Sequence, residues 1–386
     1  MQRTYMDHSA TTPVHPDVVK EMLTVLTDNF GNPSSIHGFG RSAREAVEQA
    51  RSQVADLIGA KSEEIIFTSG GTEADNLAII GAAYAHRDRG RHLITSKIEH
   101  HAVLDTFKFL ERQGFEVSFL PVDQYGQVSP ELFKEAIRDD TILVSLMHAN
   151  NEVGTIQPIA EIGRMTRERG ILFHTDAVQT VGRIPVDVSS LGVDMLSLSA
   201  HKFYGPKGIG ALYLRRRVKI QPLVHGGGQE RKWRSGTENV PGIVGLGKAA
   251  ELARDEMPQR NAKLTELGRT LAQRITSEIP DSILTGHPEQ RIPGHVSACF
   301  AGVEGESMLI RLDMVGFAAS SGSACTSGAL EPSHVLLALG LSHEVAHGSL
   351  RLSLGKDNTM EDVDRLMQVL PEIVSGLRAM SPLYKK

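Results

Sequence analysis

The stretch Asp194-Met195-Leu196-Ser197-Leu198 is followed by Ser199-Ala200-His201-Lys202 and then by the glycine-rich turn 204–210. The apolar run predicts a buried strand, and the glycines and Pro206 predict a tight turn behind it. Lys202 should therefore lie at a strand end, where open α/β sheets bind ligands. An amine placed there can form a Schiff base, although a lysine in a surface loop fits this stretch equally well.

The sequence before this stretch alternates predicted strands with predicted helices. Other apolar, β-branched runs predict strands at 64–68, 91–95, 142–146 and 170–174. Stretches of helical period, such as 44–58 and 158–169, separate them. Strands that alternate with helices are typical of βαβ units. We therefore predict an α/β fold built on a mainly parallel sheet.

The C-terminal third has a different pattern. After Met257-Pro258 the chain predicts a long helix around 261–279, shorter strands, a loop of small residues and a closing helix at 360–380. This pattern predicts a second, smaller α+β domain. We expect residues 1–15 to pack on the small domain, residues 16–257 to form the large domain, and residues 258–386 to form the small domain.

Composition narrows the function classes. The 386 residues carry 41 basic and 46 acidic side chains, a net charge of 41 − 46 = −5 with no charged block, so nucleic-acid binding is not expected. No apolar run approaches the roughly 20 residues that span a bilayer, and the first residues do not resemble a signal peptide. We expect a soluble cytoplasmic protein. With only Cys299 and Cys325, a disulfide framework is not expected.

Asp176 follows the apolar run 171–175. A buried carboxylate is costly unless it meets a cation, and the pyridinium nitrogen of pyridoxal phosphate (PLP) is such a cation. Asp176 could equally cap the next helix. Gln179, one helical turn later, could reach the 3-oxygen of the ring.

Three more segments lie just past predicted strands. The run Ser69-Gly70-Gly71-Thr72-Glu73 can present glycines and a helix N-terminus to a phosphate, but it also suits an ordinary helix cap. His100 could stack on a cofactor ring and carry protons, with His101 as its rival. Asn150-Asn151 offers an amide to the ring oxygen.

The chain resembles the cysteine desulfurases of the NifS and IscS type, a class V aminotransferase group among the fold-type I PLP enzymes. The resemblance implies a seven-stranded, mainly parallel sheet in the large domain. It runs from end to end through the motifs Asp7-His8-Ser9-Ala10-Thr11-Thr12, Phe30-Gly31-Asn32-Pro33-Ser34-Ser35, His225-Gly226-Gly227-Gly228-Gln229-Glu230, Arg234-Ser235-Gly236-Thr237-Glu238-Asn239 and Arg351-Leu352-Ser353-Leu354-Gly355.

The resemblance implies a role for each matching residue. Lys202 matches the Schiff-base lysine, Asp176 the pyridinium partner and His100 the histidine that stacks on the ring. Arg351 matches the arginine that binds the substrate carboxylate, and Asn32 is expected to help there. Thr237 matches a threonine that reaches the phosphate of the neighbouring subunit, which implies a homodimer. The remaining cofactor contacts implied in the same subunit are Gly71, Thr72, Asn151, Gln179, Ser199 and His201.

Cys325 lies in the run Ser320-Ser321-Gly322-Ser323-Ala324-Cys325-Thr326-Ser327-Gly328. Such small side chains cannot anchor a packed core, so we expect a loop that solvent can reach and that carries one thiol. Cys299, within an apolar run, is expected to be a buried structural thiol.

The resulting hypothesis is a PLP enzyme that takes sulfur from L-cysteine, leaves L-alanine, and holds the sulfur as a persulfide on Cys325. Lys202 would remove the Cα proton and His100 would exchange the thiol proton. The resemblance implies an iron–sulfur scaffold protein as the acceptor. No resident metal is expected, although Cys325 could transiently ligate a cluster shared with that scaffold.

Other readings stay open. An aminotransferase or a selenocysteine lyase would share the cofactor residues and differ at Cys325, whereas a binding protein would have lost catalysis. Whether the sulfur serves nitrogenase, general cluster assembly or tRNA thiolation cannot be read from these residues.

Overall fold

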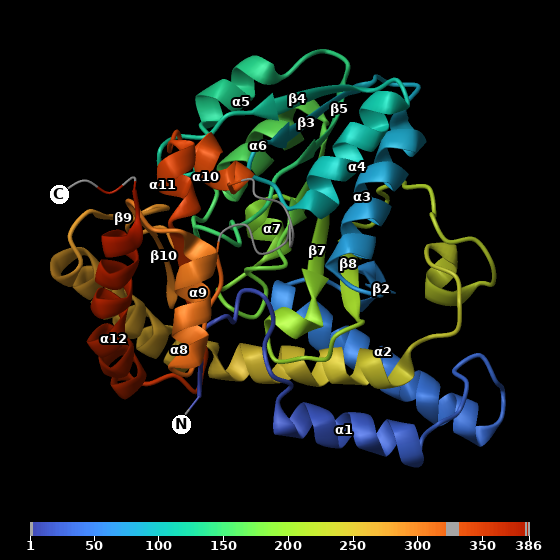
Figure 1. Cartoon of the computed structure of the whole chain (residues 1–386). Helices are drawn as coiled ribbons and strands as arrows, with labels where there is room; N and C mark the ends of the chain where they lie inside the picture. The colour runs from blue at the N-terminus through green and yellow to red at the C-terminus, as the bar shows by residue number, and fades with distance from the viewer. Residues whose placement is uncertain (1–2, 322–331, 383, 385–386) are drawn as a thin grey trace.

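The computed structural model describes residues 3–321, 332–382 and 384, and Figure 1 shows its arrangement. The predicted closing helix has the bounds expected from its sequence, Met360–Met380. The helices and strands are β1 (Thr4–Tyr5), α1 (Pro16–Thr27), α2 (Gly38–Ile58), η1 (Ser62–Glu64), β2 (Ile65–Thr68), α3 (Gly71–His86), β3 (His92–Ser96), α4 (His101–Arg112), β4 (Glu116–Leu120), α5 (Pro130–Ala136), β5 (Thr141–Ser145), α6 (Ile159–Arg169), β6 (Leu172–Asp176), α7 (Val188–Leu191), β7 (Met195–Ser199), η2 (Ala200–Lys202), β8 (Gly210–Leu214), η3 (Gln229–Lys232), α8 (Val240–Glu278), β9 (Ser282–Leu284), β10 (His295–Phe300), α9 (Gly305–Met314), β11 (Phe317–Ala318), α10 (His334–Ala338), α11 (His343–His347), β12 (Ser349–Ser353) and α12 (Met360–Met380).

The largest sheet has seven strands in the order β2-β8-β7-β6-β5-β3-β4. Strands β7, β6, β5, β3 and β4 run parallel to one another, whereas β8 is antiparallel to both β2 and β7. The predicted α/β fold with a mainly parallel seven-stranded sheet is confirmed. Because the parallel strands end at one edge, the residues that follow them gather there.

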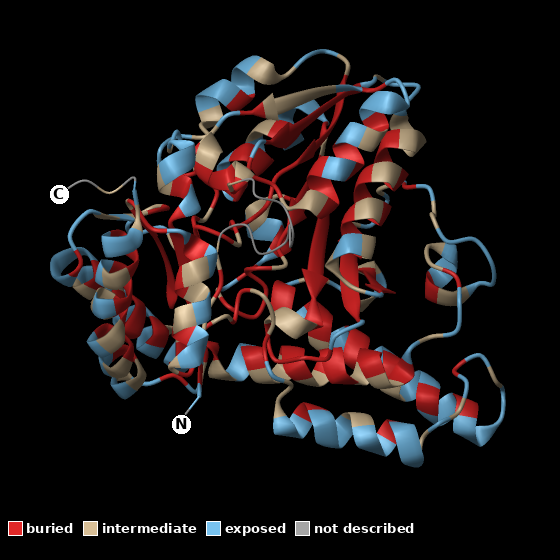
Figure 2. Cartoon of the chain, viewed as in Figure 1, coloured by how far each residue is buried: buried red, intermediate tan, exposed pale blue. Residues whose placement is uncertain are grey.

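Helices cover both faces of this sheet, and successive side chains of each strand point alternately into the two cores. In β2, Phe67 points to the core under α2 and α8, while Ile66 points to the opposite core under α3 and α4. In β7, Leu196 and Met195 divide in the same way. Successive side chains of a strand face opposite sides, so a strand covered by helices on both faces places apolar side chains in both cores. Figure 2 shows the central strands of the sheet as buried, whereas the edge strand β4 is mostly intermediate.

Helix α8 differs from the expectation of a helix that starts near 261. It begins at Val240 and continues through Pro258. Proline removes one backbone hydrogen bond, which normally favours a helix break. Here both halves of the helix bury apolar side chains, Met257 in the core beside the large sheet and Leu264 in a second core. That burial on both sides explains why one helix spans the predicted domain boundary.

The second core lies around a three-stranded antiparallel sheet in the order β12-β10-β9, packed by α8, α9 and α12. The N-terminal segment contributes Met6 to this core. Its strand β1 pairs with β11, and Asp7 forms an isolated bridge to Ser353, the last residue of β12. Within the described residues, none of the helices combines the length and apolar character that crossing a bilayer demands.

Candidate active site

Lys202 and Asp176 lie at the carboxyl edge of the large sheet. Asp176 is the last residue of β6, and Lys202 ends the short 3-10 turn that follows β7. The Lys202 ammonium donates hydrogen bonds of 2.8 Å to the carbonyls of both Ser9 and Ala10. The N-terminal segment therefore helps to hold the lysine in place.

His100 faces the same space. It caps the N-terminus of α4, where its Nδ1 accepts a hydrogen bond of 3.1 Å from the N–H of Ala102. Burial lowers the pKa of His100, with opposite contributions from the charges of Asp176 and Lys202. Its neighbour His101 instead lies 3.7 Å from Asp105 and packs on His334. Of the two histidines, His100 is the one whose pKa is shifted by the charges of Asp176 and Lys202.

Three buried carboxyl groups gather beneath this position. Burial raises the pKa of Asp176, and the nearby charges of His100 and Lys202 oppose that rise. Burial also raises the pKa of Asp75, with a further increase from the charge of Asp176, and it raises the pKa of Glu99 to about 8. Among the described residues, Asp75 Oδ1 and Glu99 Oε2 have no hydrogen-bond partner. Such a cluster fits a cationic group at Asp176, as the pyridinium of PLP would be.

The turn before α3 suits an anion. Gly70 has φ 157° and ψ −176°, a conformation that is essentially restricted to glycine, and no side chain caps the helix. The first N–H groups of α3 therefore have no intrahelical partner. A Cβ at Gly71 would lie 2.7 Å from Val178, and one at Gly70 would lie 3.9 Å from the hydroxyl of Ser199. The glycines thus let the backbone of the turn pack closely against Val178 and Ser199, and a helix N-terminus of this kind can bind a phosphate.

Two further predicted phosphate contacts border this turn. Thr72 is exposed in the first turn of α3. His201 contacts the hydroxyl of Thr11 through Nδ1 at 3.1 Å. Burial lowers the pKa of His201 to about 4, and the charges of Lys202 and Lys207 add to the effect. A neutral imidazole can still donate one hydrogen bond to a phosphate oxygen.

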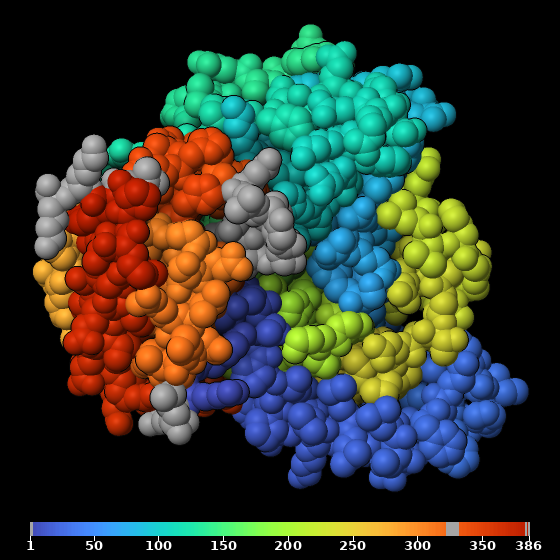
Figure 3. All heavy atoms as spheres, viewed as in Figure 1, coloured from blue at the N-terminus to red at the C-terminus, as the bar shows by residue number. Residues whose placement is uncertain are grey.

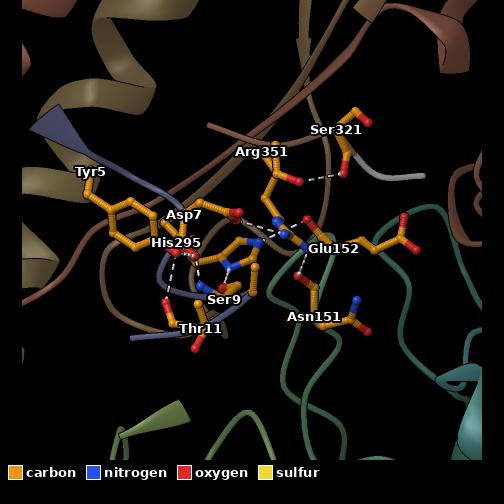
Figure 4. Close-up of polar contacts among 12 residues, drawn as sticks. Tyr5, Asp7, Ser9, Thr11, Asn151, Glu152, His295, Ser321 and Arg351 are labelled. Carbon is orange, nitrogen blue, oxygen red and sulfur yellow. Dashed lines mark hydrogen bonds and ion pairs between the residues drawn. The ribbon is translucent and has the colours of Figure 1, made fainter. Parts of the chain in front are cut away.

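Arg351 lies in the middle of β12 and is buried. Figure 4 shows its guanidinium between the N-terminal segment and the loop after β5. Nη2 donates to Asp7 Oδ1 at 2.9 Å, and Nη1 donates to the carbonyl of Asn151 at 3.1 Å. Nε is buried and has no hydrogen-bond partner among the described residues. The arginine thus retains a donor for another acceptor.

The two asparagines that follow β5, Asn150 and Asn151, differ in what their side chains contact. The side chain of Asn150 is wholly buried and stabilises its own loop, because Oδ1 accepts from the N–H groups of Glu152 and Val153. Asn151 is less buried, and its backbone rather than its side chain contacts Arg351.

Gln179 is tied to the N-terminal segment. It donates to the carbonyl of Ser9 at 3.0 Å and accepts from Arg183 at 3.1 Å. Its amide is therefore oriented by two fixed partners at the carboxyl edge of the sheet.

Asn32 and Thr237 do not join this group within the chain. Both are exposed, and Asn32 accepts a hydrogen bond from the N–H of its near neighbour Ser34. Cys325 lies outside the described residues. The other cysteine, Cys299, is buried as predicted, and burial raises the pKa of its thiol to about 12.

Sequence reasoning missed several residues of this site. Asp7, Ser9 and Ala10 were noted only as part of a motif, yet they contact Arg351 and Lys202. Asp75 and Glu99 were not singled out either. A carboxylate inside an apolar helix or just past an apolar strand was the available signal, because burial of such a group requires a reason.

Comparison with known proteins agrees with this fold. Residues 4–366 match the family described as Aminotransferase class-V, and the chain belongs to that family. It is 60% identical over 382 residues to the cysteine desulfurase IscS of Methanosarcina thermophila, covering 99% of this chain and 94% of that protein. It is 55% identical over 386 residues to the cysteine desulfurase IscS of Clostridium botulinum, covering 100% and 97%.

A solved structure titled as a NifS-like protein superposes with a TM-score of 0.91 at 40% identity, covering 97% of this chain and 100% of that one. Within the class V aminotransferases, the predicted similarity to cysteine desulfurases of the NifS and IscS type is confirmed over the full length.

Proposed function

We propose that this enzyme is a PLP-dependent cysteine desulfurase that converts L-cysteine to L-alanine and keeps the sulfur atom as a persulfide on Cys325. The observation that carries the proposal is the convergence of Lys202, Asp176 and His100 at one sheet edge. They lie close enough that the charges of the other two groups shift the pKa of His100 and that of Asp176. The full-length similarity to cysteine desulfurases supports the same activity.

Residues of this chain would hold PLP by its two ends. The N-terminus of α3 with Gly71 and Thr72, together with Ser199 and His201, would bind the phosphate. Asp176 would pair with the ring nitrogen, and Asn151 and Gln179 would contact the ring oxygen. When bound, PLP supplies an electron sink that allows a proton to leave Cα and the C–S bond to break.

The remaining residues have distinct tasks. Lys202 would accept the Cα proton at Nζ as the neutral amine, and the carbonyls of Ser9 and Ala10 place that nitrogen at the sheet edge. His100 donates through Nε2, since Nδ1 accepts the N–H of Ala102 and the neutral ring then carries its proton on Nε2. Arg351 binds the substrate carboxylate.

Cys325 would act as the sulfur acceptor. Its thiolate forms a bond to the substrate sulfur while the C–S bond of the substrate breaks, so one cysteine and one protein thiol give one alanine and one protein persulfide. The persulfide would then pass to an iron–sulfur scaffold protein. The names of the relatives support cluster assembly as the destination.

A homodimer would complete the site. Large apolar side chains on α1, on the loop after it and in the first turn of α2 are more than half exposed, with Ile36 at 92%. An exposed apolar surface of this kind favours a protein interface. Thr237 and Asn32 are themselves exposed and would reach the neighbouring subunit from here. The residues of this α1 surface are Val19, Leu23, Leu26, Phe30, Ile36 and Phe39.

The test is release of sulfide and alanine from L-cysteine in the presence of a reductant, for the wild type and for Cys325→Ala. We expect the variant to lose sulfide release and to keep the visible absorbance of bound PLP. Cys299→Ala is the matched control, since its thiol is buried, and it should retain activity. Equal activity of wild type and Cys325→Ala would contradict the persulfide mechanism and favour another PLP reaction.

A further inference from the structure

Arg351 already holds a carboxylate of its own chain. The Asp7 side chain meets Nη2 at 2.9 Å, while the arginine side chain is only 4% exposed and that of Asp7 is 18% exposed. A buried guanidinium without an anion is costly. Among the described residues, Asp7 is the only carboxylate within ion-pair distance of Arg351. Asp7 therefore serves as its counter-ion.

The N-terminal segment holds Asp7 firmly. The N–H of His8 donates to the carbonyl of Ser353, and the N–H of Ser353 donates to the carbonyl of Met6. Residue 7 thus lies beside β12, two residues from Arg351 along that strand. Tyr5 adds a hydrogen bond of 3.0 Å from its hydroxyl to the carbonyl of Asp7. In Figure 3 the segment, in dark blue, reaches the surface between the elements of the two cores.

A substrate carboxylate on Arg351 would find that guanidinium already paired. A further carboxyl, Glu152, is buried nearby; burial raises its pKa to about 7, and the charge of Arg351 opposes the rise. Like charges around one cation weaken the binding of each. We propose that Asp7 is a positioning residue that acts through Arg351 and sets how tightly the substrate and product carboxylates are held. This inference rests on the proposed role of Arg351.

The consequence concerns product release. L-Cysteine and L-alanine carry the same carboxylate, so a clamp that binds it very tightly retains the product as well. Binding substrate and product equally tightly lowers KM without raising kcat, and product release often limits turnover. Asp7 shifts this balance toward release of L-alanine.

Asp7→Asn tests the inference in the holoenzyme because it removes the charge and keeps an oxygen acceptor for Nη2. We expect the Kd for L-alanine, measured by calorimetry, to fall on the order of ten-fold, and the KM for L-cysteine to fall with it. kcat should stay level or decrease. The matched control is Asp362→Asn, because Asp362 accepts from Thr4 of the same segment at 3.1 Å and has no contact with Arg351 among the described residues.

The double variant with Arg351→Gln shows whether Asp7 acts through the arginine, since the effect of Asp7→Asn should then vanish. Asp7→Ser removes the charge with a smaller side chain and provides the same test if the amide does not fit. An unchanged or raised Kd for L-alanine in charge-neutral variants that fold would overturn the inference. Failure of the wild type to desulfurate cysteine would instead reject the proposed function, because the binding experiment needs no turnover.

Discussion

The buried ion pair of Arg51 and Glu230 offers the sharpest stability test. Both side chains are 4% exposed. Two hydrogen bonds, of 2.8 and 2.9 Å, join the guanidinium to the carboxylate, and Glu230 also accepts the N–H of Phe67 at 2.9 Å. Glu230→Gln leaves a buried guanidinium without this counter-ion. We expect a loss of about 3–5 kcal/mol in the free energy of unfolding.

The assay is urea denaturation, supported by thermal melting. With an unfolding entropy of about 2.1 cal/mol/K per residue, this loss corresponds to a decrease of about 4–6 °C in Tm for a chain of this length. Glu48→Gln is the matched control, because Glu48 contacts the same arginine at 3.1 Å but is 45% exposed. Its loss should be about 0–1 kcal/mol.

The pair also has a role in the fold around Thr237. Glu230, Arg231 and Lys232 have φ values of 42°, 56° and 72°, which are strained for residues other than glycine. The ion pair anchors this turn a few residues before Thr237. Replacing both partners, as Arg51→Met with Glu230→Leu, should cost less than Glu230→Gln alone. Equal losses for Glu230→Gln and Glu48→Gln would refute the argument from burial.

Three further predictions concern the site and the interface. Burial raises the pKa of Glu99 from 4.5 to about 8, so between these pH values the folded state keeps a proton that the unfolded state releases. Wild-type stability should therefore fall as pH rises through that window, by about 1.4 kcal/mol per unit of pKa difference. In urea melts at several pH values, Glu99→Gln should remove this component, whereas the exposed control Glu45→Gln should not. Gly71→Ala places a Cβ 2.7 Å from Val178 and should lower PLP retention after dialysis at least ten-fold, whereas Gly38→Ala, whose nearest contact would be 3.9 Å, should have no effect. Leu23→Glu, on the exposed face of α1, should shift the assembly toward monomers as measured by light scattering. The stability of the chain should change by less than about 0.5 kcal/mol, because the side chain is exposed. An unchanged mass would place the interface elsewhere.

Periodicity was enough to predict the elements that carry the site. The strand expected at 170–174 is found at Leu172–Asp176, and the one expected at 194–198 is found at Met195–Ser199. Each strand begins with two apolar side chains that point to the two opposite cores, Leu172 and Phe173 in β6 and Met195 and Leu196 in β7, which is a strong local signal. Helix α8 was misjudged because a proline is a local signal too, and burial in two cores outweighed it. Tertiary packing decides such cases, and no window of sequence contains it.

Contacts at the site were harder to predict than residue types. Arg351 and Asp7 are 344 positions apart, and the acceptors of Lys202 are backbone carbonyls, which every residue possesses. No pattern marks a carbonyl as special until the fold brings it to an ammonium group. Asn32 and Thr237 are the reverse case. The resemblance implies a role for each, but both are exposed and do not join the other site residues within the single chain.

The N-terminal segment gives the site a coupling that neither core has alone. Met6 is buried in the small core, Asp7 pairs with Arg351, and the carbonyl of Ser9 accepts from Lys202. A displacement of this segment must therefore move the carboxylate clamp and the lysine together. Asp7→Asn, which leaves the backbone bonds intact, should change carboxylate affinity alone. Variants that loosen the segment at Met6 should change both carboxylate affinity and the environment of Lys202, and this difference separates the charge of Asp7 from the position of its backbone.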